Sequence, residues 1–152
     1  HVRTLAAIEA GAHVVEVPHG YLNVVQARAR TYCAVTRAQL LPFGLDAPVV
    51  INALADVALS LPVCPQEVWC VAGSGTLCRA LQQAWPAATV HAVRIGAVPQ
   101  VGRAHVWQAP ETFEHAAMMP PPYPSCSNYD AKAWRFILRH ALPGALVWNV
   151  AA

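Results

Sequence analysis

The sequence predicts a three-layer α/β fold, in which a mostly parallel sheet is covered by helices on both faces. Three observations predict it: helical and strand-like segments alternate over residues 2–96, their connections are short, and the strand-like segments are apolar. The length of 152 residues and the apolar content of 56 % suit a domain with a core of ordinary size. We therefore expect one α/β domain over residues 1–152.

Five segments precede residue 67, and they alternate between helical and strand-like spacing of apolar residues. A helix over residues 2–11 is followed by a strand over 12–17, which the turn sequence PHG ends. A helix over 22–35 and a strand over 38–43 repeat this order. The helix predicted over 47–61 has a proline in its first turn, where proline is tolerated.

The following segments continue the alternation as far as residue 96. They are a strand over residues 67–72, a helix over 76–85 and a strand over 89–96. Beyond them the pattern weakens, because four of the chain's 13 prolines fall within residues 118–128 and exclude regular structure there. The remaining predicted elements are a strand over 104–109, a short helix over 111–117, a helix over 129–142 and a buried strand over 145–152.

Charge and cysteine content restrict the class of protein. The net charge of +2 and the scattered arginines form no basic run, so we expect no nucleic-acid partner. No apolar run reaches the roughly 18 residues that a membrane span needs, so we expect no membrane partner. The five cysteines are an odd number without a CxxC pair, which favours reduced thiols and a cytoplasmic location. No histidine has HxH or HExxH spacing, so we expect no metal site.

The stretch VWCVAGSGTLCRAL, residues 68–81, leads from a predicted strand into a predicted helix through Gly73, Ser74, Gly75 and Thr76. The first N–H groups of a helix lack partners, and the helix dipole favours an anion there. Glycines let the backbone approach a phosphate closely, and the two hydroxyl groups add donors. The loop has neither GxGxxG spacing nor the GK[ST] of a P-loop. It predicts a phosphate-binding loop, with a plain turn as the alternative.

The order of segments around this loop is similar to that of a known family. Residues 41–61 (LPFGLDAPVVINALADVALSL), 67–86 (EVWCVAGSGTLCRALQQAWP) and 89–96 (TVHAVRIG) resemble the second half of fold-type II pyridoxal-phosphate enzymes. They look most like the aminocyclopropane-carboxylate deaminase and D-cysteine desulfhydrase branch. Residues 8–20 (IEAGAHVVEVPHG) resemble a strand of the family's smaller domain. The resemblance covers about residues 1–96 and extends to short bacterial and phage proteins of that group.

The resemblance implies a pyridoxal-phosphate cofactor whose phosphate Gly73, Ser74, Gly75 and Thr76 hold. It also implies lyase or deaminase chemistry on a small amino acid. The family carries its Schiff-base lysine in the N-terminal part of the fold, whereas the single lysine here, Lys132, follows the loop. We therefore expect the C-terminal portion of a longer protein, or a chain whose catalytic machinery was lost or rebuilt. A missing N-terminal segment or a second copy of the chain is the expected partner.

A second group of polar residues precedes the last predicted helix. The stretch PPPYPSCSNYDAKAW, residues 120–134, presents them on a loop that prolines stiffen. The resemblance implies that a late Ser, Thr or Cys contacts the pyridine nitrogen of the cofactor, which makes Ser125, Cys126 and Ser127 candidates. Tyr129 and Lys132 are the candidates for catalysis, the lysine as Schiff base or general base. The alternative is that this group only caps the helix.

Three functions stay open at this point. The segment order and the loop favour a pyridoxal-phosphate-dependent lyase or deaminase. The single, late lysine favours a catalytically silent module that binds a phosphorylated small molecule or nucleotide. Phosphoribosyl transfer fits the βαβ order, but its chemistry needs an acidic pair before the loop, and VWCVAGSGT has none.

Overall fold

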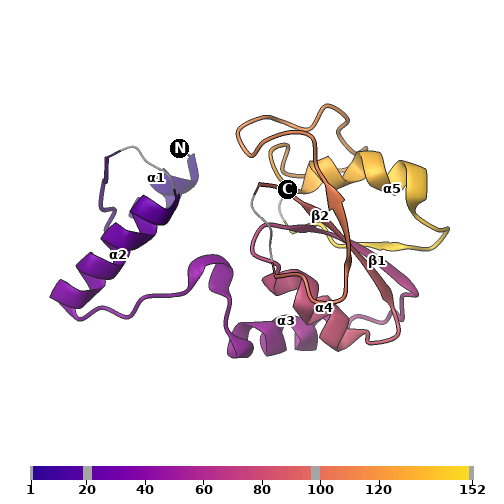
Figure 1. Cartoon of the computed structure of the whole chain (residues 1–152), viewed down its shortest axis with the longest axis horizontal. Coiled ribbons are helices and arrows are strands. Elements are labelled where there is room, and N and C mark those ends of the chain that lie inside the picture. The colour runs from indigo at the N-terminus through magenta and orange to yellow at the C-terminus, as the bar shows by residue number, and fades with distance from the viewer. Residues whose placement is uncertain (1, 19–21, 97–99, 151–152) are drawn as a thin grey trace. The chain divides into compact units, whose positions relative to one another are not determined.

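The computed structural model of the chain describes residues 2–18, 22–96 and 100–150. Contacts between residues divide the chain into two compact units, His1–Leu41 and Pro42–Ala152, called unit 1 and unit 2 below (Figure 1). The expectation of a single domain stays a prediction. No helix in the described ranges is long and apolar enough to cross a membrane.

Unit 1 contains two helices, and residues 12–18 between them have no regular secondary structure. The helices are α1 (Val2–Glu9) and α2 (Leu22–Thr36), and no residue of α2 is buried. Residues 12–17 form no strand, so the strand predicted there is wrong. An extended segment becomes a strand only when a neighbouring backbone accepts and donates its hydrogen bonds, and no described residue pairs with 12–17 in this way.

Unit 2 is built on a four-stranded sheet in the order β3-β2-β1-β4. The strands are β1 (Glu67–Ala72), β2 (Thr89–Arg94), β3 (His105–Gln108) and β4 (Leu146–Val147). All neighbouring pairs are parallel, and β1 lies at the centre with all six residues buried. A strand buried on both faces requires the continuous apolar run that the sequence has at this point.

Helices cover both faces of this sheet, which confirms the predicted α/β class (Figure 1). On one face, α3 (Pro48–Ser60) packs against α4 (Thr76–Ala84). On the other face lies α5 (Trp134–His140), which continues the 3₁₀ turn η2 (Asp130–Ala133).

Two hydrophobic cores result, one on each face of the sheet. Val68 and Cys70 of β1 point into the core that contains Leu81 of α4. Trp69, which alternates with them along the strand, points into the core that contains Ile137 of α5. This alternation is the side-chain period of two residues that a β-strand imposes.

Three further predicted elements differ from the structure. The strand predicted over 38–43 is absent, because no described backbone pairs with these residues. Its last residue belongs to the 3₁₀ turn η1 (Phe43–Leu45), in which Gly44 has a φ of +67°. Residues 111–117 contain turns and no helix, as expected for a short segment without an apolar face to bury. The last predicted strand is reduced to β4, and its residues 151–152 lie outside the described part of the chain.

Candidate functional site

The glycine loop, residues 73–76, joins the end of β1 to the start of α4. Gly75 precedes α4 with a φ of +89°, and a Cβ added to it would lie 2.2 Å from the carbonyl oxygen of Gln100. A Cβ added to Gly73 would lie 2.8 Å from the hydroxyl oxygen of Tyr129. Gly75 therefore demands glycine, whereas a side chain at position 73 would require the Tyr129 hydroxyl to shift. The loop lies beyond the carboxyl end of β1, which is where open α/β sheets bind their ligands.

The two hydroxyl groups of the loop contact the turn η1. The Thr76 hydroxyl donates to the carbonyl oxygen of Gly44 at 2.9 Å, and the Ser74 hydroxyl lies 3.4 Å from the same oxygen. The two hydroxyl oxygens are 3.0 Å apart. A Cβ added to Gly44 would lie 2.2 Å from the Cβ of Ser74, so η1 packs directly on the loop.

A cavity of about 400 Å³ lies beside the glycine loop. Its walls are the loop itself, η1, the first half of α3, and the side chains of Tyr129 and Trp148. A volume of this order accommodates a small organic ligand, and mostly apolar walls with a few polar groups are typical of such sites. The cavity brings together five of the predicted site residues: Gly73, Ser74, Gly75, Thr76 and Tyr129.

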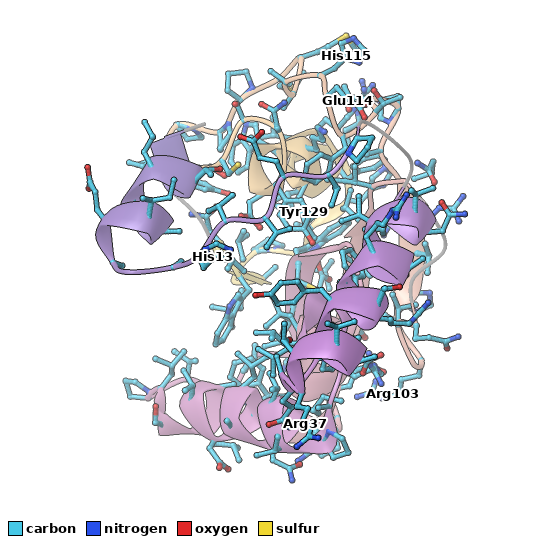
Figure 2. All side chains as sticks on the ribbon, turned by 90° about the vertical axis from the view of Figure 1, so that its left-hand side faces the viewer. His13, Arg37, Arg103, Glu114, His115 and Tyr129 are labelled. Carbon is cyan, nitrogen blue, oxygen red and sulfur yellow. The ribbon has the colours of Figure 1, made fainter. Side chains whose placement is uncertain are left out.

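Tyr129 adds a half-buried phenol to this cavity. Its pKa is raised to about 12, chiefly by desolvation and also by the charges of Asp130 and Cys70, against a hydrogen bond with the Gly73 backbone that lowers it. The phenol therefore keeps its proton at neutral pH and can donate it. The Tyr129 ring packs edge to face against the ring of Phe113, with the ring centroids 6.2 Å apart, and Figure 2 labels Tyr129 below the exposed residues Glu114 and His115.

Lys132 lies away from the cavity walls. Its side chain is only 1 % exposed, and the ammonium group donates to the carbonyl oxygen of Thr112 at 2.8 Å. The ammonium also lies 5.9 Å from the centre of the Phe113 ring. Burial lowers the pKa of Lys132, while the charge of Glu111 raises it. In this position the side chain ties the segment around Thr112 to η2.

The two predicted serines also lie outside the cavity walls. The Ser125 hydroxyl donates to Oδ1 of Asn149 at 2.7 Å. Ser127 is exposed, and its hydroxyl donates to Oδ1 of Asn128 at 2.9 Å. The N-cap residues of η2 and α5 are Tyr129 and Ala133, and neither forms a side-chain cap hydrogen bond.

Sequence reasoning missed the contribution of η1 and its neighbours to the site. Gly44 and Trp148 line the cavity, and Asp46 forms an ion pair with Arg79 of α4. The available signal was the glycine two residues after Pro42, a combination typical of turns. Nothing in the sequence indicated that this turn packs on residues 30 positions later.

Cysteines and metal ligands contribute little to the site. All five thiols are free, but only Cys70 and Cys78 are buried. Within residues 2–18, 22–96 and 100–150, no group of three His, Cys, Asp or Glu residues is placed to hold a metal ion.

Comparison with known proteins identifies a similar fold. No protein-family model matches the chain, and no curated protein matches it. A solved structure described as that of an ACC deaminase homologue superposes on 94 % of this chain with a TM-score of 0.73 and 11 % sequence identity. The chain spans 59 % of the length of that protein. The likeness shows that this α/β fold is of the kind found in an ACC deaminase homologue.

Proposed function

We propose that this chain is the phosphate-binding part of a pyridoxal-phosphate-dependent lyase or deaminase that acts on a small amino acid. The observation that carries the proposal is the glycine loop, which opens α4 and lines a cavity of about 400 Å³. It does so in a fold like that of an ACC deaminase homologue.

The residues of the loop fit a phosphate group. The start of α4 offers backbone N–H groups and the positive end of the helix dipole. Ser74 and Thr76 add hydroxyl donors. When bound, pyridoxal phosphate supplies an electron sink for a substrate carbanion.

The chain's own residues can bind the cofactor, orient it and hold a proton beside it. The glycine loop fixes the phosphate and so the position of the ring, and the apolar side chains of α3 exclude water. The protonated phenol of Tyr129 holds a proton on Oη at the cavity wall. No described lysine lines this cavity, so the proposal assigns the Schiff-base lysine to a segment outside this chain.

Titration with pyridoxal phosphate, followed by visible absorbance and displacement by inorganic phosphate, tests the proposal. We expect saturable binding that phosphate displaces. Thr76→Val and Gly75→Val should weaken or abolish binding, while Gly144→Ala, at an open position of similar φ, should retain it. Circular dichroism checks that each variant is folded. Absence of saturable binding in the folded wild type would contradict the proposal.

Borohydride reduction in the same experiment tests catalysis by Lys132. A stoichiometric adduct on Lys132, located by mass spectrometry, would place the Schiff base within this chain. Binding without an adduct would support a lysine supplied from elsewhere.

A catalytically silent module that binds a phosphorylated small molecule or nucleotide is the second candidate. The engagement of the Lys132 ammonium by Thr112 favours it. Ligands without an aldehyde, such as a sugar phosphate or a nucleotide, should then bind as tightly as pyridoxal phosphate. A clear preference for the aldehyde-bearing ligand would speak against this second function.

A further inference from the structure

Two acceptor groups contact polar side chains in the first part of α4. One is the carbonyl oxygen of Gly44 in the turn η1, and the other is the carboxylate of Asp46, the residue after η1. We propose that the Gly44 carbonyl and the Asp46 carboxylate occupy the positions of an anionic ligand on Ser74, Thr76 and Arg79. Arg79 is then a ligand-binding residue that Asp46 masks until the turn moves away. This inference rests on the proposed phosphate site and names a further residue of it.

The hydroxyl donors of the glycine loop are engaged by Gly44. A hydroxyl group has one proton to donate, and Thr76 gives its proton to the Gly44 carbonyl oxygen at 2.9 Å. The Ser74 hydroxyl has the same oxygen at 3.4 Å and the Thr76 hydroxyl at 3.0 Å. An anion that uses these donors must therefore replace the Gly44 oxygen, one acceptor for another.

Arg79 is engaged in the same way by Asp46. It lies three residues after Thr76 on α4, so the two side chains share one face of the helix. Its Nη2 donates to the Asp46 carboxylate, while its buried Nε has no hydrogen-bond partner among the described residues. A guanidinium group binds a phosphate through two parallel N–H bonds, and the unpartnered Nε is the second such donor once the turn has moved.

The turn itself is poorly suited to stay closed. Gly44 and Leu45 have φ values of +67° and +52°, and the left-handed conformation is disfavoured for leucine. Phe43 is 56 % and Leu45 48 % exposed, so about half of each side chain remains in solvent when the turn is closed. The hydroxyl contacts and the ion pair are therefore the interactions that an incoming anion can take over.

Calorimetry with inorganic phosphate, combined with limited chymotrypsin digestion, tests displacement of the turn. We expect phosphate to accelerate cleavage after Phe43 several-fold, with half-saturation at the concentration that half-saturates binding. Phosphate binding that leaves cleavage unchanged, or slows it, would overturn the displacement while leaving the phosphate site intact. Absence of phosphate binding would overturn both proposals.

Two charge variants test the role of Arg79 at constant ionic strength. Asp46→Asn frees Arg79 and should tighten phosphate binding roughly two- to fivefold, the range of a partly exposed ion pair. Asp56→Asn, at an exposed position of α3, makes the same charge change and should have little effect. Arg79→Gln should weaken phosphate binding by a similar factor. Equal affinities for the two asparagine variants, or an unchanged affinity in Arg79→Gln, would overturn the proposal.

Discussion

Gly75 meets two demands that no other residue type meets at once. Its φ of +89° lies in the left-handed region, and its Cα approaches Gln100 so closely that an added Cβ would lie 2.2 Å from the carbonyl oxygen. The first demand is conformational and the second is steric. They can be separated by comparison with Gly144, which has a φ of +84° and nothing within 4 Å of an added Cβ.

Gly75→Ala should therefore destabilise the protein more than Gly144→Ala. Both substitutions incur about 1–2 kcal/mol for a left-handed alanine, and only the first must also displace the Gln100 backbone. Urea unfolding of both variants measures the two free-energy changes. Equal losses of stability would show that the loop yields to the extra methyl group without strain.

The phenol of Tyr129 should make stability depend on alkaline pH. Its pKa of about 12 in the fold exceeds the ordinary value near 10, so the fold favours the neutral phenol. The resulting stabilisation is complete below about pH 10 and is lost as pH rises toward 12, by at most about 2.7 kcal/mol. Urea unfolding at pH 9 and pH 11.5 should show a steeper decline in the wild type than in Tyr129→Phe.

Tyr32→Phe is the control for that pH series, because Tyr32 is an exposed residue of α2. Its decline should match that of the wild type. If Tyr129→Phe declined in parallel with both, the phenol would have the same proton affinity in the folded and unfolded chain.

At the scale of elements, the carboxyl end of α4 depends on a side chain from the segment before β3. The Arg103 guanidinium donates to the carbonyl oxygens of Ala88, Trp85 and Pro86 at 2.9, 3.3 and 2.7 Å. These carbonyls belong to the connection between α4 and β2, where backbone acceptors lack helical partners.

Arg103→Lys should loosen this connection. A lysine ammonium cannot span three carbonyl groups as a planar guanidinium does, so we expect a loss of about 1 kcal/mol in unfolding free energy. Arg139→Lys, at an exposed position in the last turn of α5, is the matched control and should change stability little. Thermal unfolding with the same midpoint for both variants would contradict this role.

The elements also show what sequence reasoning can predict. Periodicity located β1, α4 and β2, because burial on both faces and an amphipathic helix leave clear patterns. It mispredicted residues 12–17 and 38–43, whose composition suits a strand but which lack a partner backbone in the described structure.

The candidate site likewise contains residues that the sequence predicted and residues that it did not. The glycine loop and Tyr129 were predicted, and the cavity brings them together. Gly44 and Arg79 were not, because their placement depends on contacts across more than 30 residues that no local pattern encodes.

At the scale of the whole chain, local stability should differ sharply between the two units. Every residue of β1 is buried, whereas α2 has no buried residue. Backbone hydrogen bonds that open without exposing core surface open at low free energy. Hydrogen exchange should therefore be slow in β1 and fast in α2. Equal protection of the two elements would show that α2 is buried against something outside the described contacts.

The central strand β1 should tolerate the insertion of a residue poorly. Val68 and Trp69 belong to different cores, and their β4 neighbours Leu146 and Val147 divide in the same way. An insertion of one residue within β1 would exchange the contents of both cores at once, since each side chain beyond it would switch faces. An insertion between residues 113 and 118 would shift no strand register. Mutational scanning of insertions should therefore find β1 intolerant and that loop permissive, which makes the loop the natural point for attaching a reporter.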